Sequence, residues 1–159
     1  MKLSKANSHF IKALDNYNFG KLSDCIEQIE YTLSNNNDHA GAHYLLGRVS
    51  EEYAYDYNKA KELYLEAIRL DSNFHPTYLW YIDLLIELED YVEAKKIIDL
   101  AFTVVSVDNS YLNKRLGQIH EKKEEFEKEK EMYKEASYKS INDSFRESMS
   151  KAMKRCKRK

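Results

Sequence analysis

Apolar residues recur along most of this 159-residue chain at intervals of three and four, which is the spacing of one face of an α-helix. Polar turn clusters interrupt the pattern regularly, and successive clusters end 35 residues apart, at Asp38, Asn73, Asp108 and Asp143. Between two clusters lie two helical stretches separated by a short polar break. The pattern therefore predicts a helix–turn–helix unit of about 34–35 residues that repeats along the chain.

We expect four such units, over residues 6–39, 40–74, 75–109 and 110–143. Their helices are expected near 8–16, 21–33, 40–53, 58–70, 76–88, 91–104, 111–123 and 126–139. Because neither helix of such a pair can bury its apolar stripe alone, neighbouring units must stack. The sequence therefore predicts one all-α domain over residues 1–159. A capping helix is expected over 144–159, because Phe145, Met149, Ala152 and Cys156 share one helical face.

Particular residues of the second unit support this prediction. Its first helix has Leu46 and Gly47, and its second has Ala60, Tyr64 and Ala67 at positions i, i+4 and i+7. This order resembles the tetratricopeptide repeat (TPR) family, whose unit of about 34 residues has a Leu-Gly pair followed by a small–aromatic–small triad. The resemblance implies a right-handed α-α superhelix.

The other units match the same pattern to different degrees. The third and fourth units supply Tyr78, Tyr91, Ala94, Ile98, Ala101, Leu116, Gly117, Phe126, Tyr133 and Ala136. The first unit is degenerate, with Ala13 in place of the Gly and with Cys25, Ile29 and Thr32 as its triad. The second unit has one extra residue around 55–57, and Glu129 stands where a small residue is expected.

The resemblance also implies that the first helices of the units line a concave groove. It places these residues on that surface: Phe10, Leu14, Tyr17, Tyr44, Arg48, Glu52, Leu79, Trp80, Asp83, Tyr111, Lys114, Arg115 and Gln118. Aromatic anchors among charges of both signs suit an extended or helical peptide, although many of these rings could equally belong to the core. Trp80 and Arg115 are the strongest candidates, because neither occupies a packing position of the family.

One known use of the family is not expected. Co-chaperone TPRs grip the carboxylate of a chaperone tail with Lys, Asn and Arg at five places. Counted from the second unit, only Arg115 matches; counted from the first, none of the five residues matches. The five residues counted from the first unit are Phe10, Leu14, Leu45, Pro76 and Trp80.

The net charge of −2 averages two different regions. Residues 1–150 hold 19 basic and 27 acidic side chains, whereas the last nine residues hold six cations and no acid. The cations of this basic tail are Lys151, Lys154, Arg155, Lys157, Arg158 and Lys159. They could complement the dipole at a helix C-terminus, or bind an acidic partner, a nucleic acid or an anionic membrane. An acidic body makes a nucleic acid or membrane the less favoured partner.

No enzyme motif is present in the sequence: there is no GxSxG, no P-loop and no GxGxxG. We expect no metal site, because His39 and His43 have no third ligand at a suitable spacing and His120 has no second His. Cys25 is expected to be a buried, unreactive thiol. The acidic pairs 51–52 and 124–125 are expected to be solvated.

The sequence therefore predicts a scaffold or adaptor, without enzymatic activity or cofactor, that binds another protein or peptide. A chaperone-like role is a narrower version of this hypothesis. The alternative is a nucleic-acid- or membrane-associated factor that uses the basic tail. Two distant cysteines and the lack of an apolar leader or membrane-spanning stretch favour the cytoplasm.

Overall fold

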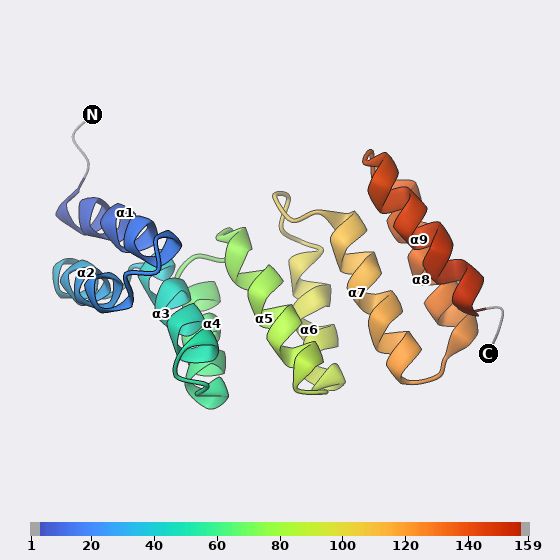
Figure 1. The fold of residues 1–159 in the computed structure, drawn as a ribbon, viewed down its shortest axis with the longest axis horizontal. Coiled ribbons are helices and arrows are strands. Elements are labelled where there is room, and N and C mark those ends of the chain that lie inside the picture. The colour runs from blue at the N-terminus through green and yellow to red at the C-terminus, as the bar shows by residue number, and fades with distance from the viewer. Residues whose placement is uncertain (1–3, 157–159) are drawn as a thin grey trace. The chain divides into compact units, whose positions relative to one another are not determined.

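The computed structural model describes residues 4–156, and in this range the chain forms nine α-helices and no strand (Figure 1). The prediction of an all-helical protein is therefore confirmed. The helices are α1 (Lys5–Asn18), α2 (Leu22–Asn35), α3 (Ala40–Glu52), α4 (Tyr57–Leu70), α5 (His75–Glu87), α6 (Tyr91–Ala101), α7 (Asn109–Lys122), α8 (Phe126–Lys139) and α9 (Asp143–Cys156).

The predicted period appears directly in the helix starts. The first helices of successive units begin at Lys5, Ala40, His75 and Asn109, which are 34 or 35 residues apart, and α9 begins at Asp143. Helices α1 and α2, α3 and α4, and α7 and α8 pack as pairs, and α9 packs on α8. These three helix pairs thus pack as the helix–turn–helix pattern predicts.

Helix α5 contains the boundary between two compact units of the chain. Unit 1 ends at Tyr81, and unit 2 begins at Ile82. Each unit has its own buried residues: Ile29, Leu45 and Tyr64 lie in unit 1, and Leu85 and Tyr133 in unit 2. The expectation of a single domain with the four repeat boundaries given above stays a prediction.

Two helix ends differ by three residues from the expected positions, for local reasons. Helix α1 begins three residues earlier, because the Ser4 side chain accepts a hydrogen bond from the Asn7 amide (3.1 Å) and caps it. Helix α6 ends at Ala101 and not near residue 104, because the next residues form turns that bury Val104 and Val107. In both places burial or capping by a neighbour outweighs the periodic pattern.

The turn inside each helix pair has one residue in the left-handed backbone region. These residues are Gly20 (φ 70°), Tyr55 (φ 53°), Glu89 (φ 59°) and Glu124 (φ 58°). In three of the turns the following amide donates to a carbonyl five residues back, as from Asp90 to Leu85 (2.8 Å). In the α3–α4 turn the Asp56 amide reaches back six residues to Ser50 (2.9 Å). This longer bond accommodates the extra residue that the sequence places in the second repeat, residues 40–74.

Small residues allow close packing within the pairs. A Cβ atom on Gly47 would lie 2.8 Å from Cε1 of Tyr64, and one on Gly117 would lie 2.6 Å from Cε1 of Tyr133. A Cβ atom on Gly41 of α3 would likewise lie 2.6 Å from Cζ of Phe10 on α1, so Gly41 allows close packing between two first helices, which the TPR pattern does not predict. These glycines therefore serve helix packing.

The predicted apolar face of α9 is confirmed. Met149, Ala152 and Cys156 are buried against Tyr133 and Ala136 of α8, and Phe145 packs on the same cluster. Glu129, which stands at a small-residue position, is also buried, and its carboxylate adds to the burial that raises the pKa of the Cys156 thiol, while the thiol itself donates to the Ala152 carbonyl (3.3 Å). Helix α9 thus covers the apolar side of the last helix pair.

Candidate binding surfaces

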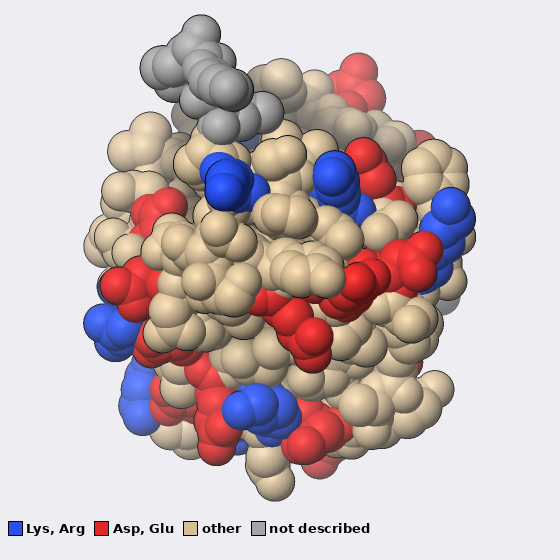
Figure 2. Space-filling view, turned by 90° about the vertical axis from the view of Figure 1, so that its left-hand side faces the viewer, with Lys and Arg blue, Asp and Glu red and all other residues tan. Residues whose placement is uncertain are grey.

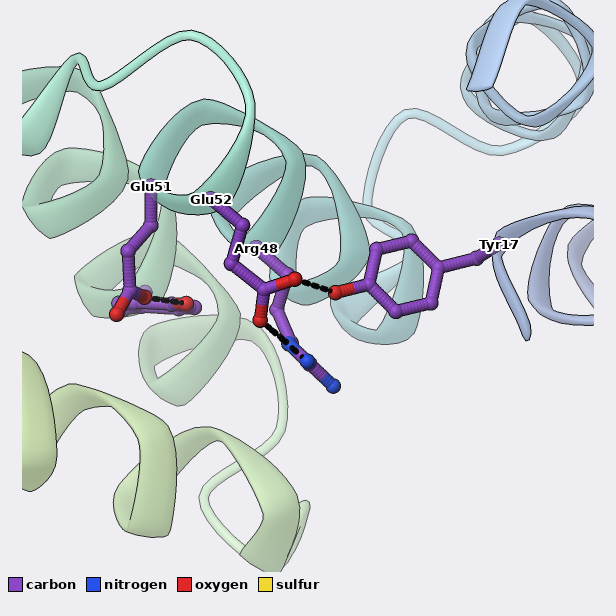
Figure 3. A network of polar contacts seen from close by, with 5 residues as sticks. Tyr17, Arg48, Glu51 and Glu52 are labelled. Carbon is purple, nitrogen blue, oxygen red and sulfur yellow. Dashed lines mark hydrogen bonds and ion pairs between the residues drawn. The ribbon is translucent and has the colours of Figure 1, made fainter. Parts of the chain in front are cut away.

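The first helices of unit 1 carry a connected network of polar and aromatic side chains (Figure 3). Glu52 of α3 is its centre: it accepts a hydrogen bond from the Tyr17 hydroxyl of α1 and two from the Arg48 guanidinium, the shorter being 2.5 Å. Two predicted groove residues, Tyr17 and Arg48, are therefore joined through a third, Glu52. This network links α1 to α3.

Arg48 also lies against aromatic rings. Its guanidinium carbon is 3.4 Å from the centre of the Trp80 ring on α5 and 4.8 Å from that of Tyr17. A guanidinium attracts the negative face of an aromatic ring, and this attraction grows when the pair is shielded from water. Arg48 therefore connects three first helices of unit 1, and we call Tyr17, Arg48, Glu52 and Trp80 the Arg48 cluster.

Unit 2 has a second cluster of the same residue types. Asp83 of α5 accepts hydrogen bonds from the Tyr111 hydroxyl (2.6 Å) and from Nη2 of Arg115 (2.6 Å), both on α7. Arg115 also donates to Gln118 (2.7 Å), and its guanidinium carbon is 4.7 Å from the Tyr111 ring centre. We call these four residues the Arg115 cluster. The structure thus brings four of the predicted groove residues together, and two of them, Tyr111 and Arg115, bond to the Asp83 carboxylate.

The remaining predicted groove residues have different surroundings. The Tyr44 side chain is buried and its ring lies 5.5 Å from Phe74. The Phe10 ring lies 4.7 Å from that of His39, while Leu14 and Leu79 are half-buried. The Lys114 ammonium lies 5.9 Å from the centre of the Phe145 ring on α9. Tyr44 therefore belongs to the core and not to a surface that a partner could reach.

The electrostatics fix the protonation state of both clusters at neutral pH. Burial, and next the bond to Glu52, raise the pKa of Tyr17; burial and the bond to Asp83 raise that of Tyr111. Burial alone would lower the pKa of Arg48, but its bonds to Glu52 and Tyr44 outweigh this and raise it. The phenols therefore donate hydrogen bonds and the arginine stays charged.

Three carboxylates of the acidic pairs 51–52 and 124–125 accept hydrogen bonds from other side chains, whereas the sequence predicts only solvated acids. Glu51 accepts a hydrogen bond from the Tyr64 hydroxyl (2.5 Å), and Glu125 accepts bonds from His120 (2.6 Å) and Lys128 (3.1 Å). The prediction that these acids are merely solvated is wrong for Glu51, Glu52 and Glu125. The Arg48–Glu52 and Lys128–Glu125 pairs have the i,i+4 and i,i+3 spacing of one helix and could be read from the sequence. The bonds from Tyr17, Tyr64 and His120 have no sequence signal, because these partners lie on other helices.

The histidines are used in local structure. His39 caps α3, since its Nδ1 accepts a hydrogen bond from the Ala42 amide (3.1 Å), and burial lowers its pKa. His43 Nε2 lies 2.8 Å from the Asn37 carbonyl oxygen. Among the described residues, no group of three or more His, Cys, Asp or Glu side chains is arranged to hold a metal ion.

Three residues of the basic tail, at 157–159, lie outside the described part of the chain. Of the other three, Lys151 pairs with Glu147 (2.8 Å) and Arg155 lies 4.0 Å from Glu121. The view onto the side where α1 and α2 lie shows acidic side chains across its middle, with Lys and Arg above and at its edges (Figure 2). That face lacks the continuous basic surface typical of nucleic-acid-binding proteins. No described helix is long and apolar enough to cross a membrane.

Paired helices of this length, repeated every 34 or 35 residues and closed by a covering helix, define a TPR-type helical repeat. No protein-family model matches the sequence, and no curated protein matches it. Solved structures do match, and they agree with this class.

Three of these structures illustrate the likeness. PilF of Pseudomonas aeruginosa matches with a TM-score of 0.81 and 19% identity over 96% of this chain and 67% of that chain. MamA of Desulfovibrio magneticus RS-1 has a TM-score of 0.70 and 12% identity over 99% and 96% of the two chains. TTC0263, a thermophilic TPR protein of Thermus thermophilus, has a TM-score of 0.65 and 14% identity over 93% and 81%. The chain therefore has the fold of TPR proteins.

Proposed function

We propose that this protein is a non-enzymatic scaffold that binds a peptide or protein segment through the first helices of its repeats. The observation that carries the proposal is the pair of clusters on α1, α3, α5 and α7. Each presents a half-buried arginine, a carboxylate and an aromatic ring in fixed geometry. Rigid aromatic and arginine side chains dominate the binding energy of most protein interfaces, because little conformational entropy is lost when they bind.

The fold supports the same role in a general way. Helical repeats expose long surfaces to which extended or helical segments can bind. A cytoplasmic location goes with this proposal, since both cysteines are free and buried. A chaperone-like role would be one form of it, with a segment of an unfolded or unassembled partner as the ligand.

The test is to capture partners with the tagged protein, identify them, and then measure the affinity of the purified partner directly. Lys114→Glu on α7 and Trp80→Ala on α5 should each weaken that affinity at least tenfold. Matched changes on α8 are the controls: Lys128→Glu reverses an exposed charge, and Tyr138→Ala removes an exposed ring.

Circular dichroism should show the same helix content in all four variants. The proposal fails if the affinity of the purified partner falls with the α8 variants and not with those on α5 and α7. It also fails if all four variants bind as tightly as the wild type.

A further inference from the structure

Helix α9, the last helix of unit 2, is attached to α8 by an apolar face. Its buried side chains pack on the cluster around Tyr133 that is described above. Its ion pair with α7 is long and open to solvent, because the exposed Arg155 side chain lies 4.0 Å from Glu121. An exposed ion pair of this kind adds little to the free energy of folding. The attachment of α9 therefore depends on its apolar face.

A buried carboxylate lies beneath the end of this helix. Glu129 of α8 is 1% exposed, and neither of its carboxylate oxygens has a hydrogen-bond partner among the described residues. Burial, and next the nearby Glu129 carboxylate, raise the pKa of the Cys156 thiol, so the end of α9 lies beside this carboxylate. The Glu129 side chain is therefore enclosed where α9 meets α8.

The groups around Glu129 are bound to other partners. The Tyr133 hydroxyl donates to Glu121 of α7 (3.0 Å), and Arg155 lies 4.0 Å from the same Glu121 carboxylate. The Cys156 thiol donates to a backbone carbonyl of its own helix (3.3 Å). A buried polar group without a hydrogen bond lowers stability whether or not it carries a charge. Opening of α9 returns Glu129 to water and removes this cost.

The segment that contains α9 keeps its local contacts when it leaves α8. Asn142 caps the helix by accepting a hydrogen bond from the Phe145 amide (3.1 Å), and Lys151 pairs with Glu147 one turn away (2.8 Å). In the connection between α8 and α9 the Ile141 side chain is fully exposed, so no buried contact of this residue holds the connection in place. Segments with few buried contacts open locally while the rest of a domain stays folded.

We propose that α9 is a latch, which opens from α8 while the α7–α8 pair stays folded, and that the buried Glu129 carboxylate favours this opening. The closed form covers the apolar face of α8 around Tyr133, and the open form exposes it. Opening and closing of α9 thus control access to this face. The latch goes beyond the function proposed above and does not depend on it.

Hydrogen–deuterium exchange of the full-length protein, followed by mass spectrometry at neutral pH, tests the latch. In the wild type, the amides of α9 should exchange at least tenfold faster than those of α8, after correction for their intrinsic rates. Glu129→Ala removes the buried carboxylate and supplies the small residue that the repeat pattern expects. It should slow the exchange of α9 at least tenfold, because the closed form no longer buries an unpaired polar group.

Two further variants separate the carboxylate from side-chain volume and from net charge. Glu129→Gln keeps the volume and removes the charge, and it should slow the exchange of α9 about threefold, since a neutral amide costs less to bury than a carboxylate. Glu131→Ala is the matched control, because it removes an exposed carboxylate from the same helix. It should leave the exchange of α9 unchanged. Circular dichroism should show the same helix content in all three variants.

Three results would overturn the proposal. If α9 and α8 exchange at the same rate in the wild type, α9 opens only when the whole unit unfolds. If Glu129→Ala and Glu131→Ala change the exchange of α9 equally, the buried position of the carboxylate is not the cause. If Glu129→Gln, which leaves no cavity, speeds the exchange of α9, the carboxylate stabilises the closed form.

Discussion

Units 1 and 2 build the same packing contact from the same three residue types. In unit 1, Tyr64 of α4 lies over Gly47 and donates a hydrogen bond to Glu51, four residues after the glycine (2.5 Å). In unit 2, Tyr133 of α8 lies over Gly117 and donates to Glu121, again four residues later (3.0 Å). A glycine makes room for the ring, and a carboxylate one helical turn further on holds its hydroxyl.

The arginine clusters of the two units are built differently. Arg48 is bonded to a carboxylate on its own helix and lies over two rings, whereas Arg115 is bonded to a carboxylate on another helix and lies over one ring. The Nε atom of Arg115 is also buried without a hydrogen-bond partner. The glycine–tyrosine–glutamate contact within a helix pair is therefore the same in both units. The arginine contacts that join the first helices differ between the units.

The largest expected effect concerns the shared contact. Gly117→Ala should lower the free energy of unfolding by about 2–3 kcal/mol and Gly47→Ala by about 1–2 kcal/mol, because the new methyl group collides with a buried ring. The order follows from the two distances, 2.6 Å at Gly117 and 2.8 Å at Gly47. Denaturant unfolding followed by circular dichroism measures both. Equal stability of the wild type and both variants would show that the rings move aside freely.

A second prediction separates the two arginine clusters. In double-mutant cycles, the Asp83→Ala and Arg115→Ala changes should be coupled by about 1–2 kcal/mol, because this hydrogen bond between charged groups joins two helices. The Glu52→Ala and Arg48→Ala changes should be coupled by about 0.5 kcal/mol, the usual value for a pair on one helix. The exposed pair Lys95–Asp99 on α6 is the reference. Similar coupling in both clusters would remove the distinction drawn above.

A smaller effect is expected at the turn of unit 1 that has a glycine. Gly20→Ala should lower the free energy of unfolding by about 1 kcal/mol, because alanine is strained at a φ of 70°. The space around this glycine is open, with no atom within 4 Å of an added Cβ, so the backbone alone causes the loss. If Gly20→Ala costs as much as Gly117→Ala in the same unfolding experiment, strain and collision are not distinguishable here.

The smallest effect is a loss of stability at alkaline pH, to which each unit contributes one thiol. Burial raises the pKa of Cys25 in unit 1 to about 11, and burial together with Glu129 raises that of Cys156 in unit 2 to about 11. A raised pKa means that the unfolded chain loses its thiol proton first. Stability is therefore constant below the ordinary thiol pKa and falls as the pH rises toward 11. Each thiol should contribute about 0.8 kcal/mol of this loss between about pH 8 and pH 9.5.

The free energies of unfolding of Cys25→Ala and Cys156→Ala at the two pH values measure how much each thiol contributes to the alkaline loss of stability. The cost of the lost side-chain volume is the same at either pH and therefore cancels. A thiol reagent should modify Cys156, near the end of α9, before Cys25 in the core of unit 1. An equal pH slope in the wild type and both variants would contradict the assignment to the thiols.

Much of the fold could be predicted from the sequence, because it depends on residues close together in the chain. The spacing of apolar residues gave the helices, and the turn clusters gave the interval between the starts of α1, α3, α5 and α7. Gly47 and Gly117 could be assigned to the Leu-Gly pair of the TPR pattern from the sequence, and the structure shows that they serve helix packing. Helix ends were predicted less well, as at α6, where burial of Val104 and Val107 ends the helix early.

The candidate sites were predicted only as positions on a surface. Trp80 and Arg115 stood out because they fit no packing position, yet the sequence did not show that each lies against a partner from another helix. Tyr44 looked equally exposed and is buried.

The sequence by itself determined which segments are helices, how often they repeat and which small residues let them approach. These properties follow from the period of the α-helix and from side-chain size, both of which act within a few residues. Only the tertiary structure decided which carboxylates bind the tyrosines and which one binds Arg115 from another helix. Glu51, Glu52 and Glu121 resemble any surface acid in the sequence, and they become part of the packing because folding brings Tyr64, Tyr17 and Tyr133 to them from other helices.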